Sequence, residues 1–178
     1  MVIVIDAGHG GRDPGAVHKA LKEKDINLKA AILLKTSLLQ LDPNLSITFT
    51  RTSDTFITLA DRVKVLGDLF VSLHCNSVDK PNKAIGFEVC CYSVGGKGGK
   101  VADSILSFVK TEFPLHGAGK SIRTDLYVLE KTKCPAVLLE LGFLNNDKDL
   151  KLLTSNASLN RLLTLVALGI LGSKQLLG

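Results

Sequence analysis

Three side chains suited to metal binding or proton transfer each lie at the end of a short apolar run. The runs are residues 2–5, 69–73 and 136–139. Short runs rich in Val, Ile and Leu, bounded by turn residues, predict buried strands of a mostly parallel sheet. In an open α/β sheet the ligand crevice lies outside the carboxyl ends of the strands. We therefore expect His9, His74 and Glu140 to meet at one sheet edge and form a metal-and-base site.

Two histidines, one carboxylate and a water form an open zinc site that is used for hydrolysis. Glu23, at the start of an expected helix, would complete such a set with His9 and His74. An acid there also has a simpler role, because it complements the helix macrodipole, and Asp25 suits that role equally well. With Glu23 as a ligand, Glu140 remains available to move protons.

Partial burial at a strand end should raise the pKa of Glu140, which suits a group that accepts a proton from zinc-bound water and passes it to a leaving amine. The simpler interpretation of Glu140 is an ion pair with Arg123 or another nearby cation.

The glycine-rich loop after the first apolar run does not match a nucleotide site. Gly8 and Gly10 fit the start of a GxGxxG motif, but Asp13 occupies the last glycine position. A P-loop also fails, because Pro114 stands where a motif ending in Gly-Lys-Ser at residues 119–121 needs its first glycine.

Apolar periodicity predicts strands and helices that alternate along the chain. Strands are expected at residues 2–5, 47–51, 69–74, 85–92, 127–129 and 136–140. Helices are expected at residues 21–40, 58–66, 101–109, 147–153 and 159–171. This alternation predicts one α/β domain over residues 1–178, with a mostly parallel twisted sheet flanked by helices on both faces. The candidate zinc site is expected at the carboxyl ends of the strands.

The composition limits the classes of partner. A chain of 178 residues that is 46% hydrophobic is long and apolar enough to bury a core. Seven Phe, two Tyr and no Trp give little support to nucleic-acid binding by stacking. The net charge of +5 suits an anionic polymer and equally suits scattered, solvated lysines.

The chain has no stretch typical of a signal peptide or of a membrane span. No basic segment precedes the first apolar run, and the longest apolar stretch, residues 162–171, is about half of what spans a bilayer. We expect a protein made in the cytoplasm without a signal peptide, or a domain of a longer secreted protein, and no insertion into membranes.

The cysteines predict buried free thiols and a reducing compartment, since none of them shows CxxC spacing. They are Cys75, Cys90, Cys91 and Cys134. A cysteine hydrolase built on Cys75 is disfavoured, because the adjacent His74 would point to the opposite face of the strand.

Several blocks follow one another in order along the chain: residues 6–11 with 13–16, 22–25, 51–52 with 54, 59–62, 68–76, 86–89, 126–129 and 135–146. Together they resemble the zinc-dependent N-acetylmuramoyl-L-alanine amidases of the type-3 group. The resemblance covers residues 2–171, nearly the whole chain. The chain departs from the family pattern at Cys75, where a small alanine is more common, and at Cys90-Cys91, which replaces an aromatic-rich pair.

The resemblance implies that His9, Glu23 and His74 bind one Zn²⁺ and that Glu140 is the catalytic glutamate. It implies hydrolysis of the amide between N-acetylmuramic acid and the first L-alanine of the peptidoglycan stem peptide. Arg123 is a candidate for binding a stem-peptide carboxylate or the lactyl carbonyl. Asn76 is a candidate for binding substrate, or else it closes a turn.

The resemblance also implies a partner and a setting. Cell-division members carry a helical insertion that blocks the site, and the stretch between Ser77 and Arg123 is too short for it, so we expect an open site. The chain resembles the catalytic module of a phage endolysin, which reaches the wall after release at lysis, and a bacterial cell-wall enzyme reduced to its catalytic domain would look similar. Wall-binding domains usually direct endolysins to a target wall, and the sequence leaves open whether one follows Gly178. The expected partner of the chain is peptidoglycan and not nucleic acid, and we expect a monomer. The alternatives are a zinc peptidase cutting within the stem peptide and a non-catalytic wall-binding module.

Overall fold

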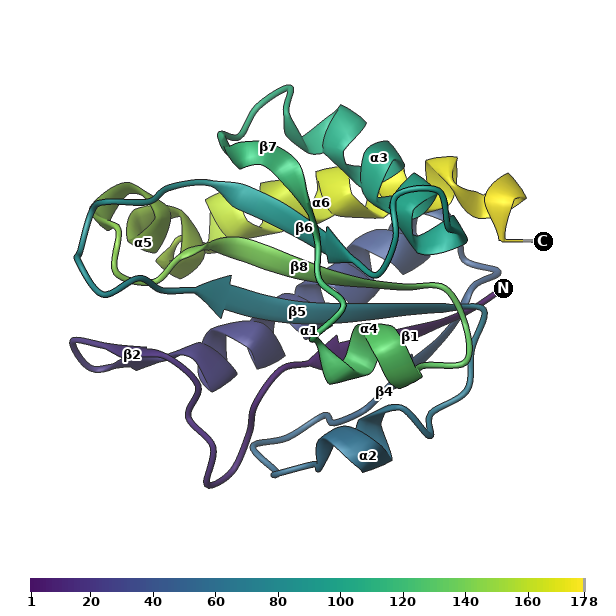
Figure 1. The fold of residues 1–178 in the computed structure, drawn as a ribbon, viewed down its shortest axis with the longest axis horizontal. Helices are drawn as coiled ribbons and strands as arrows, with labels where there is room; N and C mark the ends of the chain where they lie inside the picture. The colour runs from purple at the N-terminus through teal and green to yellow at the C-terminus, as the bar shows by residue number, and fades with distance from the viewer. Residues whose placement is uncertain (178) are drawn as a thin grey trace.

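A six-stranded sheet lies between two layers of helices in the computed structural model, which describes residues 1–177 (Figure 1). In spatial order the strands are β4 (Ser46–Phe49), β1 (Val2–Ala7), β5 (Leu69–Asn76), β8 (Ala136–Phe143), β6 (Phe87–Cys91) and β7 (Leu115–Ile122). All neighbours pair in parallel except β6 and β8, which are antiparallel. The expected α/β fold with a mostly parallel sheet is confirmed.

The helices cover the two faces of the sheet unequally. One face packs against α1 (Glu23–Leu41), α3 (Lys97–Val109) and α6 (Asn156–Gly172), and the other against the short α2 (Leu59–Arg62) and α4 (Tyr127–Lys131). The remaining elements are the hairpin of β2 (Val17–His18) and β3 (Leu21–Lys22), α5 (Asp147–Thr154) and a 3-10 turn at Lys174–Leu176. Within residues 1–177, every helix is too short or too polar to cross a bilayer.

Alternation along the strands divides the core in two. In β5, Val71 and Leu73 belong to the larger core beneath α1, α3 and α6, whereas Phe70 belongs to a smaller one beneath α2 and α4. Because α2 and α4 are short, they leave this face of the sheet uncovered near the carboxyl end of β5 (Figure 1). The side chain of His74 lies on this uncovered part of the sheet and lines a pocket there.

Several elements differ from the expectations. The helix expected at residues 58–66 covers only Leu59–Arg62, and residues 21–22, expected to begin a helix, form strand β3. The strand expected at residues 127–129 is wrong: these residues begin helix α4. Helix α4 instead buries Val128 and Leu129 in the smaller core. The edge strand β7 was not expected, since its sequence is polar and contains Gly117 and Gly119.

Leu163 gives a test of the larger core. Its side chain is fully buried in α6, which packs against α1 and α3. Leu163→Ala should lower the free energy of unfolding by about 2–5 kcal/mol, because it removes buried methyl groups and leaves a cavity. Urea denaturation followed by circular dichroism measures this loss, and an unchanged midpoint would contradict the packing described.

Candidate metal centre

Three side chains from three separate elements converge on one point. His9 follows β1, Glu23 is the first residue of α1, and His74 lies in β5. Each offers one ligand-type atom, and these atoms all lie within 4.8 Å of one another. Oε1 of Glu23 is 3.2 Å from His9 Nε2 and 2.9 Å from His74 Nδ1. Asp25, the alternative acid in the same helical turn, is exposed to solvent.

The convergence depends on glycine positions in the loop between β1 and α1. A Cβ on Gly8 would lie 2.3 Å from Cε1 of His74, and one on Gly15 would lie 2.5 Å from Oε2 of Glu23. His9 itself has a φ of 59°, a left-handed conformation that is uncommon for any residue other than glycine. The loop therefore approaches both neighbours closely and turns sharply at His9.

Gly8→Ala should reduce metal affinity without removing a ligand. The added methyl group would overlap the His74 ring and displace it from Glu23. We expect weaker zinc binding in competition with a chromogenic chelator, and a loss of activity that follows the loss of metal. A zinc affinity equal to that of the original protein would contradict this, because it would show that the His74 ring can move without weakening metal binding.

Further polar groups orient the converging side chains. His9 Nδ1 donates to Asp13 Oδ2 at 2.8 Å, and this contact turns Nε2 of the same ring toward Oε1 of Glu23. Glu23 Oε1 accepts from Asn27 Nδ2 at 3.2 Å and from the Cys75 amide at 3.0 Å. Asp13 and Asn27 were not among the expected site residues. Their only sequence signal is a spacing of four residues from His9 and Glu23.

Hydrogen bonds and charges within the cluster favour a protonated His9 imidazole beside an ionised Glu23 carboxylate. Burial of the His9 imidazole lowers its pKa, but the hydrogen bonds and charges of Glu23 and Asp13 outweigh burial and raise that pKa to about 9. Burial of Glu23 opposes its ionisation, but contacts with His74 and His9 hold the pKa of its carboxyl well below the ordinary range. A metal ion bound here would displace a proton from His9, so its affinity should fall at low pH.

Glu140 lies one strand away from His74. The two residues are register partners in β5 and β8, so their side chains lie side by side on the same face. Oε2 of Glu140 is buried and has no hydrogen-bond partner within residues 1–177. Burial raises the pKa of this carboxyl to about 7, against the opposing charge of His74. A carboxyl group in this state is suited to accept and return a proton.

The two expected substrate contacts have local partners in this structure. The guanidinium of Arg123 forms two hydrogen bonds of 2.8 Å to the carboxylate of Asp125 rather than an ion pair with Glu140. Asn76, the last residue of β5, accepts at Oδ1 from the amide of the adjacent Ser77 at 2.8 Å. Their roles toward a substrate stay predictions.

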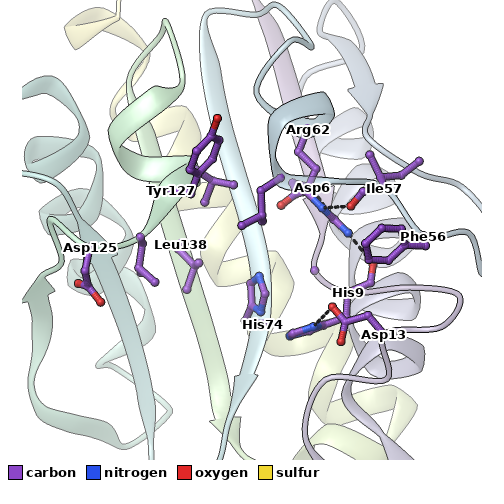
Figure 2. Close-up of a pocket in the computed structure, with 14 residues that line it drawn as sticks. Asp6, His9, Asp13, Phe56, Ile57, Arg62, His74, Asp125, Tyr127 and Leu138 are labelled. Carbon is purple, nitrogen blue, oxygen red and sulfur yellow. Dashed lines mark hydrogen bonds and ion pairs between the residues drawn. The ribbon is translucent and has the colours of Figure 1, made fainter.

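A pocket of about 490 Å³ opens beside the cluster. Figure 2 shows His9, Asp13 and His74 at one end, Phe56 and Ile57 along one wall, and Tyr127 along the other. The side chains of His9 and His74 are 25% and 21% exposed, so solvent reaches the cluster. The helix between Ser77 and Arg123 is α3, which packs in the larger core, on the other face of the sheet from the pocket. The expected absence of a blocking insertion stays a prediction.

All four cysteines are free thiols; Cys75, Cys90 and Cys91 are buried and Cys134 is half-buried. Cys75 is buried, and burial together with the charge of Glu23 raises the pKa of its thiol well above the ordinary value. A thiol held neutral in this way is a poor nucleophile, which argues against a cysteine hydrolase.

Comparison with known proteins places this geometry in a family. The family model described as N-acetylmuramoyl-L-alanine amidase matches residues 3–172. A probable cell wall amidase, LytH, of Staphylococcus saprophyticus is 38% identical over 155 residues, which are 85% of this chain and 51% of the relative. The endolysin of Bacillus phage SPP1 is 35% identical over 170 residues, which are 89% of this chain and 60% of that protein.

A comparison with solved structures points to the same family as the sequence relatives. The catalytic domain of CwlV, an N-acetylmuramoyl-L-alanine amidase from Bacillus (Paenibacillus) polymyxa var. colistinus, is 32% identical. It superposes with a TM-score of 0.88 over 98% of both chains. The present chain spans between about half and three-fifths of the length of the curated relatives it matches. It belongs to the type-3 family of N-acetylmuramoyl-L-alanine amidases.

Proposed function

We propose that this chain is a zinc-dependent amidase that hydrolyses the amide bond between N-acetylmuramic acid and L-alanine in peptidoglycan. The observation that carries the proposal is the convergence of His9, Glu23 and His74 beside the buried, unpartnered carboxylate oxygen of Glu140. Membership of the amidase family supports the choice of bond.

The three converging side chains fit Zn²⁺. Two imidazoles and one carboxylate are a donor set found in zinc hydrolases, where a water takes the fourth position. The hydrogen bond from His9 to Asp13 matches the carboxylate–histidine arrangement that commonly supports a zinc ligand. We propose that His9, Glu23 and His74 hold one zinc ion.

The protein groups have separate tasks in the proposed reaction. Zinc, when bound, polarises the scissile carbonyl and makes its water more acidic. Glu140 accepts the proton of the attacking water as the new carbon–oxygen bond forms. Glu140 then returns that proton to the alanine nitrogen as the carbon–nitrogen bond breaks. The products are a lactyl carboxylate on the sugar and a free amine on the stem peptide.

The setting is proposed at the level that the relatives share. They include a phage endolysin, a cell wall amidase and a sporulation-specific amidase of Bacillus subtilis, all of which support peptidoglycan as the substrate. We propose that the chain acts on the wall as a monomeric catalytic module, in the manner of an endolysin released at lysis. Arg123 and Asn76 are proposed to contact the stem peptide only after leaving their local partners.

Identification of the new chemical ends tests the bond that is cut. The purified chain is incubated with purified peptidoglycan, with and without a chelator, and new amino ends and reducing sugar ends are identified. We expect free N-terminal alanine that disappears on chelation and returns with added zinc. New amines on other stem residues would identify a peptidase instead. No new ends, with binding to the wall retained, would identify a binding module.

A further inference from the structure

We propose that Arg51 and Arg62 are positioning residues that hold His9 in its metal-binding conformation. The proposal rests on the proposed zinc site, but it does not depend on which bond of the substrate is cut. Both side chains are almost fully buried, with 4% and 3% of their surface exposed. Neither lies among the side chains that would contact the metal.

Arg62 binds the backbone of His9 directly. Its Nη2 donates to the His9 carbonyl oxygen at 2.7 Å, and its Nη1 donates to the Ala7 carbonyl oxygen at 2.7 Å. The guanidinium is anchored from behind by Asp6, whose Oδ1 accepts from Nη1 at 2.7 Å. Ser72 in turn donates to the other oxygen of Asp6 at 2.6 Å. This chain of contacts ties the His9 backbone to the centre of the sheet.

Arg51 binds the two residues before His9 and the start of α1. Its Nε donates to the Ala7 carbonyl oxygen at 2.8 Å, and its Nη2 donates to the carbonyl oxygens of Gly8 at 2.9 Å and Lys24 at 2.8 Å. Its Nη1 donates to the Ser53 carbonyl oxygen at 3.0 Å. Within residues 1–177, all of these acceptors are neutral carbonyl groups. One guanidinium thus connects the His9 loop to the residue that follows Glu23.

The two guanidinium groups together satisfy three consecutive carbonyl groups, those of Ala7, Gly8 and His9. These carbonyls lie where β1 leaves the sheet, so strand pairing no longer supplies their partners, and buried carbonyls need them. A non-glycine residue with a φ of 59° persists only where its surroundings hold it. The planar guanidinium can donate in several fixed directions at once, whereas the ammonium of lysine cannot. The arrangement therefore fixes the backbone from which the His9 imidazole projects.

Charge-conserving substitutions separate positioning from electrostatics. Arg51→Lys and Arg62→Lys keep a positive charge near the site but remove the forked donors. We expect the Kd for zinc, measured by competition with a chromogenic chelator, to rise by about 10- to 100-fold in each variant, as for other groups that orient metal ligands. Thermal unfolding of the metal-free forms is measured in parallel.

Two control variants isolate the effect. Arg161→Lys makes the same exchange at an exposed arginine on α6 that pairs with Glu112, and it should leave zinc affinity unchanged. Leu163→Ala destabilises the fold at a site away from the His9 loop, and it should lower the melting temperature while the Kd for zinc stays unchanged. A higher Kd in the two arginine variants alone would support positioning.

An unchanged Kd for zinc in Arg51→Lys, with or without a lower melting temperature, would overturn the proposal, because the arginines would then be structural only. If Arg62→Lys fails to fold because Asp6 loses its partner, Arg51→Lys decides the result alone, since the hydrogen bonds of Arg51 within residues 1–177 all go to carbonyl oxygens. An original protein that binds zinc but releases no alanine would refute only the proposed function. An original protein that binds no zinc would refute both.

Discussion

Glu140→Gln is expected to lower kcat on peptidoglycan by about 10²–10⁴-fold, the usual contribution of a general acid–base group, and to leave zinc affinity unchanged. The amide cannot accept the proton of the attacking water, whereas His9, Glu23 and His74 remain in place. Release of N-terminal alanine measures turnover, and chelator competition measures zinc binding.

The free energy of unfolding gives a second, independent test of the buried state of Glu140. Glu140 keeps a buried oxygen without a hydrogen-bond partner within residues 1–177, and burial raises its pKa to about 7, so the ionised side chain disfavours the folded state. Glu140→Gln should therefore be no less stable than the original protein in urea denaturation.

Glu88, the register partner of Glu140 on β6, provides the control for the catalytic role. Retained turnover in Glu140→Gln together with its loss in Glu88→Gln would transfer the role to Glu88.

His74→Ala is expected to abolish both zinc binding and activity. The change removes one of three converging ligand atoms, so the affinity loss should exceed the roughly 100-fold that loss of an orienting partner costs. Zinc content after gel filtration and alanine release measure the two losses. Added zinc should fail to restore activity in this variant, whereas it should restore the chelated original protein.

His18→Ala is the matched control for this change. His18 lies in the short strand β2 and is not one of the three converging residues. The variant should keep zinc binding and activity. Full activity of His74→Ala in the presence of chelator would show that hydrolysis does not use the proposed metal site.

The strands and their chemistry were largely predictable because the signals are local. A run of β-branched and aliphatic residues marks a buried strand, and the polar residue beyond it marks the site, which is how His9, His74 and Glu140 were found. The expectation that these strands stop at His74 and Glu140 was too short, since β5 continues to Asn76 and β8 to Phe143. Helix α4 was expected as a strand, because three apolar residues satisfy either pattern.

The choice between Glu23 and Asp25 shows where local information ends. Both acids stand in the first turn of α1, and from the residues alone neither was preferred; the family resemblance pointed to Glu23. In the structure the loop after β1 and strand β5 approach the side of the helix on which Glu23 lies, and Asp25 is left in solvent. Two residues in one helical turn face different directions, so packing decides which of them enters the site.

Local patterns along the chain were enough to predict the α/β class, the main strands and the residue types suited to a zinc hydrolase. The contacts that hold these residues in place became visible only in the folded protein. Arg51 contacts Ala7 across 44 residues, and Arg62 contacts His9 across 53. Neither contact leaves a periodic or spacing signal in the chain. The physical reason is that hydrophobic patterning specifies which face of an element is buried, whereas the partners of a buried polar group depend on strand order, register and the path of the loops.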